Sequence, residues 1–225
     1  YALIVLPNPT LSGKLTYMIS YLFYSKEGIL STPVNVCSKF IVVFIIFGSF
    51  LERTGIADFF INISNAFVGG FSGGPAKVAV ISSALEGMYS GSSVANTVGS
   101  GAVTIPLMKR TGYKPEFAAA AEASASTGGQ IMPPIMGAAA FVMAETLGVQ
   151  YSAVIKAAVL PALIYYLGII IQVQMRATKD NLNGLPKDQM PKVKDVMKER
   201  GHLLIPILFL LYMLIFSGVT VIRGA

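Results

Sequence analysis

The stretch from Glu86 to Arg110, EGMYSGSSVANTVGSGAVTIPLMKR, suits neither a lipid-facing helix nor a surface loop. It is rich in Gly, Ser, Thr and Asn, yet it lies in a chain whose other segments are strongly apolar. At membrane depth, backbone that leaves the helical conformation is tolerated only where it is buried in protein or lines a cavity. The stretch therefore predicts a functional break within a membrane protein.

A second stretch of the same kind runs from Ser124 to Gly137, SASTGGQIMPPIMG. Small hydroxyl residues, Gly and Pro interrupt apolar residues here as well, and Pro within a helix removes a backbone hydrogen bond. The two breaks lie close together in the sequence. We therefore treat them as two walls of one candidate site.

The composition of the whole chain indicates an integral membrane protein. Of its 225 residues, 54% are hydrophobic and only 12% are charged, whereas soluble domains carry about 25% charged residues. Much of the net charge of +6 comes from one loop, so we interpret it as a signal of membrane topology and expect no nucleic-acid partner. The single Cys37 excludes a disulfide framework within the chain.

The first expected region, residues 1–68, consists of scaffold helices. Leu15–Tyr24 is aromatic and flanked by lysines, which is typical of a helix that lies at the membrane interface, and ten residues are too few to span about 30 Å of hydrocarbon. Residues 34–63 are apolar enough to form one long transmembrane helix, interrupted by the charges of Glu52 and Arg53.

The second region, residues 69–147, is the expected transport part. Residues 75–108 number 34, fewer than the roughly 40 that two straight spans need. Their polar middle, with residues 89–98 as the least helical part, predicts a re-entrant hairpin of two half-length helices. Residues 115–147 predict a discontinuous transmembrane helix, broken at residues 127–129 and at Pro133–Pro134 and resuming at residue 135.

The third region, residues 148–225, returns to scaffold helices. Residues 151–175 and 202–221 predict spanning helices, and the linker 176–200 between them carries seven basic residues, which predicts a cytoplasmic location. The second part of this linker is amphipathic and suits a helix lying along the membrane. Lys109, Arg110 and Lys114 then fall on the same side, so the hairpin would open from the cytoplasm.

Two acidic residues, Glu122 and Glu145, fall within the broken helix. An acidic group inside a span is by default a candidate functional residue. Because both lie nearer the ends of the predicted helix, we expect structural or interfacial roles for them.

The oxygen-rich side chains of the two breaks suit a hard cation such as Na⁺, because soft metals prefer His or Cys ligands. The hairpin contributes Ser90, Ser92, Ser93, Asn96 and Thr97, and the second break contributes Thr127, Gly128, Gly129 and Gln130. The alternative is that Gly and Ser serve only close helix packing, for which Gly87 and Gly91 have the right spacing. No hydrolase, metalloprotease or phosphate-loop motif occurs, so we expect no enzyme.

Three long motifs resemble the large membrane subunit of TRAP transporters, of the DctM type, and look closest to the form in which small and large subunits are fused. They are GGPAKVAVISSALEGMYSGSSVANTVGSGAVTIPLMKRTGY, PEFAAAAEASASTGGQIMPPIMGAAAFVMAE and VLPALIYYLGI, within residues 40–186. The resemblance implies Na⁺-coupled uptake of an organic acid delivered by a periplasmic substrate-binding protein. It also implies an all-α, multi-pass protein of the bacterial inner membrane that works as an elevator, with the transport part sliding against the scaffold.

The resemblance also implies where the ligands bind. Sodium would be held by Ser90, Ser92, Asn96, Gly128 and Gly129. The substrate would lie beside the same tip, against Ser92, Ser93, Asn96, Thr97, Gln130 and Pro133. A complete large subunit has two inverted repeats, and this sequence holds one hairpin and one broken helix. We therefore expect the first half of a longer polypeptide, which would work with the second half and with a small membrane subunit or fused domain.

Two other functions stay open on the sequence. The first is a Na⁺/dicarboxylate symporter that needs no binding protein. The second is a structural membrane scaffold in which the polar breaks serve packing.

Overall fold

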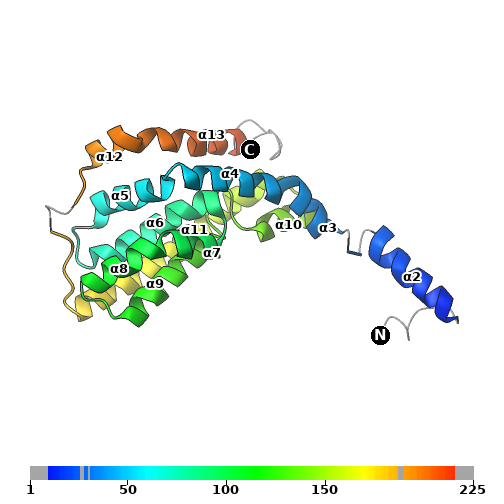
Figure 1. The fold of residues 1–225 in the computed structure, drawn as a ribbon, viewed down its shortest axis with the longest axis horizontal. Coiled ribbons are helices and arrows are strands. Elements are labelled where there is room, and N and C mark those ends of the chain that lie inside the picture. The colour runs from blue at the N-terminus through cyan, green and yellow to red at the C-terminus, as the bar shows by residue number, and fades with distance from the viewer. Residues whose placement is uncertain (1–9, 26–27, 30, 187–189, 216–225) are drawn as a thin grey trace.

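The structure, a computed structural model, describes residues 10–25, 28–29, 31–186 and 190–215. All regular secondary structure in these residues is helical, which confirms the predicted all-α class. Figure 1 shows most of the helices packed side by side with their axes roughly parallel or antiparallel. Residues 1–9 of the predicted scaffold region and the end of the predicted last span lie outside the described residues.

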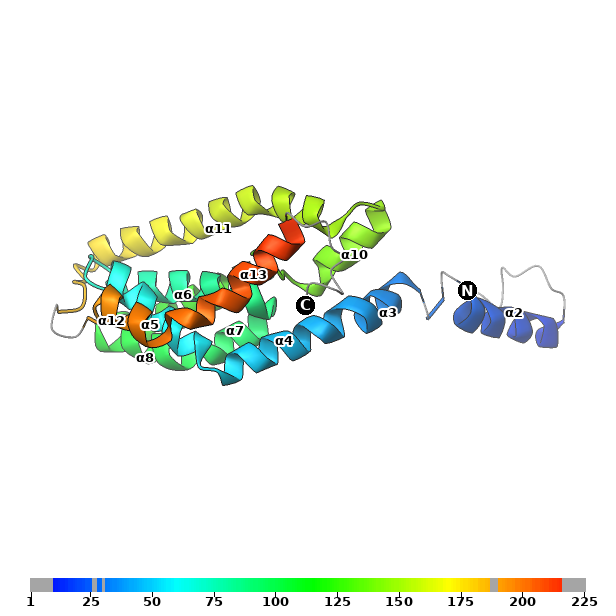
Figure 2. The same ribbon diagram turned by 90° about the horizontal axis from the view of Figure 1, so that it is seen from above.

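Helix α2 (Leu11–Tyr24) confirms the predicted helix near the N-terminus. The side chain of Thr10 caps it by accepting a hydrogen bond from the amide of Gly13 at 3.3 Å. None of its residues is buried, and it lies apart from the other helices in both views (Figures 1 and 2). Its location at a membrane interface stays a prediction.

A continuous helical run, Thr32–Arg53, is long and apolar enough to cross a bilayer. It comprises α3 (Thr32–Val36), the π-helical turn η1 (Cys37–Ile41) and α4 (Val42–Arg53). The prediction of one long helix over residues 34–63 is wrong, because the chain turns at Gly55 and α5 (Ile56–Val68) starts anew. Gly55 has a φ of 80°, a left-handed conformation that Gly adopts without steric cost.

A helical hairpin lies where the re-entrant hairpin was predicted, with its second arm divided into two helices, and its re-entry into the membrane stays a prediction. It consists of α6 (Gly74–Ser90), α7 (Ser93–Gly99) and α8 (Gly101–Arg110). Only Gly91 and Ser92 leave the helical conformation at the tip, so the break lies within residues 89–98, the part predicted to be least helical, and is confined to two residues. Gly91 takes a φ of 57°, and the Ser92 side chain caps α7 by accepting from the amide of Ala95 at 3.3 Å. These two local features allow the reversal within two residues.

The predicted discontinuous helix is also present. Its halves are α9 (Pro115–Gly128) and α10 (Ala138–Leu147), separated by residues 129–137, so helix resumes three residues later than predicted. The hydroxyl of Tyr151 donates hydrogen bonds to the carbonyls of Pro134 and Ile135 and thereby fixes the segment between the two halves.

Helix α11 (Tyr151–Lys179) is the second helix long and apolar enough to span a membrane. It extends four residues further than predicted, so the polar linker begins at Asp180. The linker then runs along the loop that precedes α6, where the amide of Gly73 donates to the carbonyl of Leu182 at 3.2 Å and the amide of Leu185 donates to the carbonyl of Gly69 at 2.8 Å. The hairpin and the linker therefore meet at one end of the molecule, as the predicted topology requires.

The predicted amphipathic helix of the linker is α12 (Val193–Arg200). It packs against α5 with Val196 buried, and Arg200 donates to the carbonyl of Gly55 at 3.3 Å. Its location along the membrane stays a prediction. After the short turn η3 (Gly201–Leu203), α13 (Leu204–Ile215) runs back along the molecule and reaches α11 (Figure 2).

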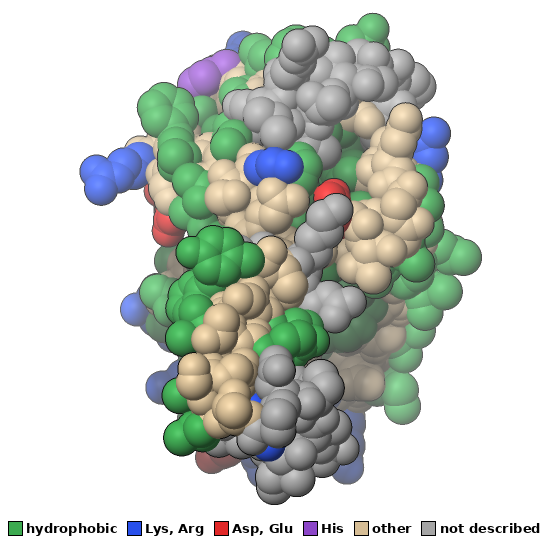
Figure 3. Space-filling model, turned by 90° about the vertical axis from the view of Figure 1, so that its right-hand side faces the viewer, with side chains coloured by type: hydrophobic (Ala, Val, Ile, Leu, Met, Phe, Trp, Pro, Cys, Tyr) green, Lys and Arg blue, Asp and Glu red, His purple; other side chains and the backbone are tan. Residues whose placement is uncertain are grey.

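Many large apolar side chains remain on the surface of the described part. They include Ile45, Ile46 and Phe50 on α4, and Leu160, Ile164 and Leu167 on α11. In Figure 3 hydrophobic side chains are spread over the flanks of the molecule rather than gathered into one patch. Lipid tails are the natural environment for such a surface, and with two candidate spans the fold is that of an all-helical membrane protein.

Candidate functional site

The tip of the hairpin packs directly against the break in the discontinuous helix. The amide of Ile135 donates to the carbonyl of Met88 at 3.3 Å, and the side-chain amide of Gln130 donates to the hydroxyl of Ser93 at 3.0 Å. A Cβ atom added to Gly91 would lie 2.0 Å from the carbonyl oxygen of Met136. The two breaks singled out in the sequence therefore form one structural unit.

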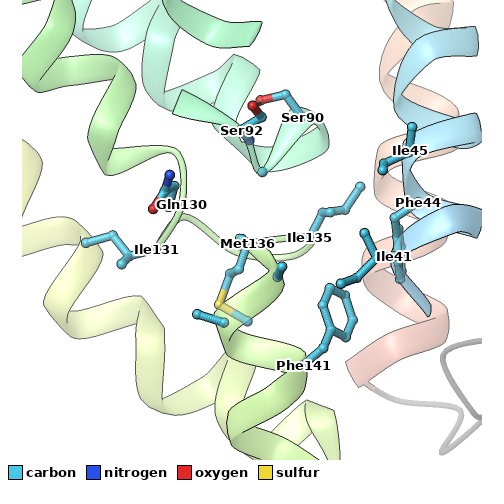
Figure 4. A pocket seen from close by; sticks show the side chains of 14 residues that line it. Ile41, Phe44, Ile45, Ser90, Ser92, Gln130, Ile131, Ile135, Met136 and Phe141 are labelled. Atoms are coloured by element: carbon cyan, nitrogen blue, oxygen red, sulfur yellow. Dashed lines mark hydrogen bonds between the residues drawn. The ribbon is translucent and has the colours of Figure 1, made fainter. Parts of the chain in front are cut away.

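A cavity of about 450 Å³ opens beside this contact. Ser90, Ser92 and Gln130 lie on one side of it, and Ile41 and Phe44, from η1 and α4, lie on the other (Figure 4). The cavity thus has a polar wall from the two breaks and an apolar wall from the preceding span. A few polar groups in a largely apolar pocket are typical of small-molecule sites.

Asn96 is buried on the inner side of α7 and does not line this cavity. Its side-chain nitrogen donates to the carbonyl of Ser83 at 2.8 Å, whereas its side-chain oxygen has no hydrogen-bond partner among the described residues. A Cβ atom added to Gly129 would lie 3.0 Å from the Asn96 nitrogen. Asn96 and the start of the break are therefore neighbours.

The remaining predicted residues are more dispersed. The hydroxyl of Thr97 donates to the carbonyl of Ser93 within its own helix at 2.8 Å. Gly128 packs against α11, since an added Cβ would lie 2.6 Å from the ring of Tyr165. Pro133 is buried and is not among the residues that line the cavity.

Close packing accounts for some of the glycines, in line with the alternative considered from the sequence. A Cβ atom added to Gly87 would lie 2.4 Å from the Cα atom of Gly129. The backbones of α6 and of the break approach each other here because neither residue has a side chain. Gly87 and Gly129 therefore have a packing role, whatever else the break does.

Of the structural or interfacial roles predicted for Glu122, the structure supports the structural one. Glu122 is fully buried between α8 and α9. Its carboxylate accepts hydrogen bonds from Ser100 at 2.6 Å, from Thr104 at 2.6 Å and from Ser126 at 3.2 Å. It is a structural residue and not an interfacial one, whereas Glu145 is exposed on α10. The spacing of four residues between Ser100 and Thr104, which puts both hydroxyls on one helix face, was the available signal.

The chemistry offered by the site is oxygen ligation. Across the described residues, His, Cys, Asp and Glu side chains form no group of three that could hold a metal ion. The groups that converge at the two breaks are hydroxyls, amides and backbone carbonyls. Oxygen donors of this kind suit alkali cations and the polar atoms of a small solute.

Comparison with known proteins agrees with this architecture. Residues 16–224 match the family profile described as "Tripartite ATP-independent periplasmic transporter, DctM component". The chain is 31% identical over 155 residues to a protein of Vibrio cholerae named C4-dicarboxylate TRAP transporter large permease protein DctM, covering 69% of the chain and 33% of that relative. It is 28% identical over 184 residues to the Pseudomonas aeruginosa protein of the same name, covering 79% of the chain and 42% of the relative.

The chain therefore spans less than half the length of these curated relatives. The family match, however, covers nearly all of the chain, including both breaks and both candidate spans. The chain belongs to the DctM family of tripartite ATP-independent periplasmic (TRAP) transporter components, which are integral membrane permeases.

Proposed function

We propose that this chain forms the first hairpin-bearing half of a TRAP permease, which takes up an organic acid together with Na⁺ across the bacterial inner membrane. The observation that carries the proposal is the cavity of about 450 Å³ at the contact of the two breaks, with Ser90, Ser92 and Gln130 on its polar wall. Its volume lies within the range of small-molecule pockets. In secondary transporters such sites are formed by interrupted helices whose ends face the ligand.

The substrate class follows from the chemistry of this wall and from the relatives. Hydroxyl and amide groups donate hydrogen bonds to carboxylate oxygens, and Ala138, the first residue of α10, brings the positive end of a helix dipole to the cavity. Two relatives are named as C4-dicarboxylate permeases, so a C4-dicarboxylate is the first substrate to test. No Lys or Arg of the described residues lines the cavity. The carboxylate charge would therefore be balanced by Na⁺ or by groups outside this chain.

Sodium would bind at the hairpin tip. The proposed ligands are oxygen atoms of Ser90, Ser92, Asn96, Gly128 and Gly129. The unpartnered, buried side-chain oxygen of Asn96 supports this assignment most directly, because it is an acceptor that lacks a donor. The carbonyls of Gly128 and Gly129 each accept one amide hydrogen bond, from Ile131 and Met132, and retain a second lone pair.

The partners follow from the family. A periplasmic substrate-binding protein would deliver the acid, and a small membrane subunit or fused domain together with the second inverted repeat would complete the permease. The basic linker over residues 176–200 would lie in the cytoplasm, and the hairpin would open from that side. Transport would proceed by the elevator movement, with residues 69–147 sliding against the scaffold helices.

The test is uptake of a labelled C4-dicarboxylate by the full-length protein in proteoliposomes, with its binding protein added outside. We expect saturable uptake that requires an inward Na⁺ gradient. Uptake that is unchanged when Na⁺ is replaced by choline would overturn the coupling. Uptake that is unchanged without the binding protein would favour a binding-protein-independent symporter, and a lack of saturable uptake of any organic acid would favour a structural scaffold.

A further inference from the structure

Helix α11 carries two neighbouring tyrosines, Tyr165 and Tyr166, that reach the broken helix where its first half ends. Their rings meet edge to face, with centroids 5.7 Å apart and ring planes at 89°. The hydroxyl of Tyr165 donates to the carbonyl of Ser124 at 2.8 Å, and that of Tyr166 donates to the carbonyl of Ala125 at 3.1 Å. The two hydroxyls therefore join the side of α11 to the part of α9 that leads into the break.

The carbonyl of Ala125 needs such a donor because α9 ends here. In a continued α-helix it would accept from the amide of Gly129, four residues later. That amide donates to the carbonyl of Ser126 at 3.1 Å instead, since the last turn of the helix is tightened. Ala125 is fully buried, and a buried carbonyl without a donor is costly. The Tyr166 hydroxyl takes the place of the lost amide and stabilises the end of α9 at this residue.

The two rings also fix the first residues of the break from one side. A Cβ atom added to Gly128 would lie 2.6 Å from the ring of Tyr165 and 2.8 Å from the ring of Tyr166. From the other side, a Cβ atom added to Gly129 would lie 3.0 Å from the Cα atom of Gly87 on the hairpin. The backbone that joins Gly128 and Gly129 is therefore enclosed between α11 and α6.

The far edge of the break is bonded to the same helix. Tyr151, the first residue of α11, donates to the carbonyls of Pro134 and Ile135. Because α11 is one continuous helix, the distance between this contact and the tyrosine pair is fixed. A single rigid element thus holds both edges of the break.

We infer that Tyr165 and Tyr166 are positioning residues, which set where α9 ends and thereby orient the carbonyls of Gly128 and Gly129. The inference rests on the proposed function for the role of those carbonyls as ligands. Neither tyrosine is among the described residues that line the large cavity, whereas Gln130, directly after the enclosed glycines, lines it. Groups that bind a ligand need neighbours that lock their geometry, and the tyrosine pair supplies this support from outside the site.

The test is initial uptake of a labelled C4-dicarboxylate by Tyr166→Phe in the full-length protein, measured in proteoliposomes as a function of Na⁺. Phe keeps the ring and removes only the hydroxyl. We expect the half-saturating Na⁺ concentration to rise about fivefold, the equivalent of one neutral hydrogen bond, with a smaller change in the maximal rate. An unchanged half-saturating concentration would overturn the inference and reduce the pair to helix packing.

Tyr113→Phe is the matched control, because Tyr113 is equally buried and its hydroxyl also donates to a backbone carbonyl, that of Gly73 at 3.4 Å. This contact lies before the first turn of α6, at the opposite end of that helix from the hairpin tip. The control should lower the Tm without moving the half-saturating Na⁺ concentration. Tyr165→Phe keeps the test decisive if Tyr166→Phe does not fold, since Tyr165 is only half-buried and the same rise is expected.

Hydrogen exchange separates this inference from the proposed coupling, because it needs neither Na⁺ nor substrate. The amides of residues 126–132 should exchange faster in Tyr166→Phe than in Tyr113→Phe. Faster exchange combined with Na⁺-independent uptake would sustain the positioning of the break and refute the coupling. Equal exchange in the two variants would show that the hydroxyl does not set the end of α9.

Discussion

Gly87 on α6 and Gly129 in the break of the discontinuous helix are in backbone contact, and a Cβ atom added to Gly87 would lie 2.4 Å from the Cα atom of Gly129. Gly87→Ala should therefore force the hairpin away from the break, at a cost of roughly 1–3 kcal/mol for overpacking. We expect a lower Tm for the full-length protein in detergent, together with reduced uptake. Thermal unfolding followed by fluorescence-detected gel filtration would measure the first effect.

The control for this substitution is Gly168→Ala on α11. An added Cβ at Gly168 meets no atom within 4 Å, and the helix propensity of Ala exceeds that of Gly by about 1 kcal/mol. Its Tm should be equal to or above that of the wild type. Equal Tm values for the two variants would show that the contact between Gly87 and Gly129 is not tight.

Glu122→Ala should destabilise the protein by removing the shared acceptor of Ser100, Thr104 and Ser126. Each hydroxyl keeps a second hydrogen-bond partner, so the loss is that of the hydrogen bonds to the carboxylate, roughly 1.5–3 kcal/mol for a bond to a charged group. Glu116→Ala is the matched control on the same helix, since Glu116 is exposed in the first turn of α9. A carboxylate at that position stabilises the helix by less than about 1 kcal/mol, through the helix dipole. Comparable losses of Tm would contradict the structural role of Glu122.

Tyr151→Phe should loosen the segment between α9 and α10. The substitution removes the hydroxyl that donates to the carbonyls of Pro134 and Ile135. Both buried carbonyls then lack this donor, which should lower the free energy of unfolding by roughly 1–3 kcal/mol. Limited proteolysis or hydrogen exchange of residues 129–137 would report the loosening. Tyr24→Phe, at an exposed position of α2, should leave the exchange of this segment unaltered.

Asn96→Ala should weaken the Na⁺ dependence of uptake. We take the lost contact between the oxygen and the cation to be worth roughly 1.5 kcal/mol, like a hydrogen bond to a charged group. This energy corresponds to an increase of about tenfold in the half-saturating Na⁺ concentration. The measurement is initial uptake in proteoliposomes as a function of Na⁺. Thr10→Ala removes an oxygen from the exposed cap of α2, remote from the site. If both variants shifted the Na⁺ dependence equally, the sodium site proposed at the hairpin tip would be refuted.

The sequence indicated the helical class, the hairpin and the broken helix because each depends on local chemistry. Gly and Pro end helices wherever they occur, and a polar segment among apolar ones is recognisable without a structure. The extent of each break was harder to predict. Residues 89 and 90 remain part of α6, and residues 93–98 are helical because Ser92 caps α7, which needs only one suitable side chain. The turn at Gly55 was missed because a single Gly beside two charges resembles a helix that nears an interface.

The buried hydrogen-bond network around Glu122 could not be predicted from local sequence. Glu122 meets Ser100 and Thr104, which lie 22 and 18 residues earlier, only after α8 and α9 have packed together. Side-chain partners across helices follow from tertiary packing. The four-residue spacing of Ser100 and Thr104 indicates a shared helix face but does not identify Glu122 as the group that this face meets.

The hydrogen bonds of Glu122 have a mechanical consequence for the large cavity. They clamp α8 to α9, and the contact of Gln130 with Ser93 ties the tip to the break, so the polar wall is a stiff block. The opposite wall, at Ile41, Phe44 and Ile45, presents only hydrocarbon, which slides without breaking directional bonds. The cavity should therefore widen, to admit or release a solute, by movement at the contact between this block and α4, because that movement requires the least free energy.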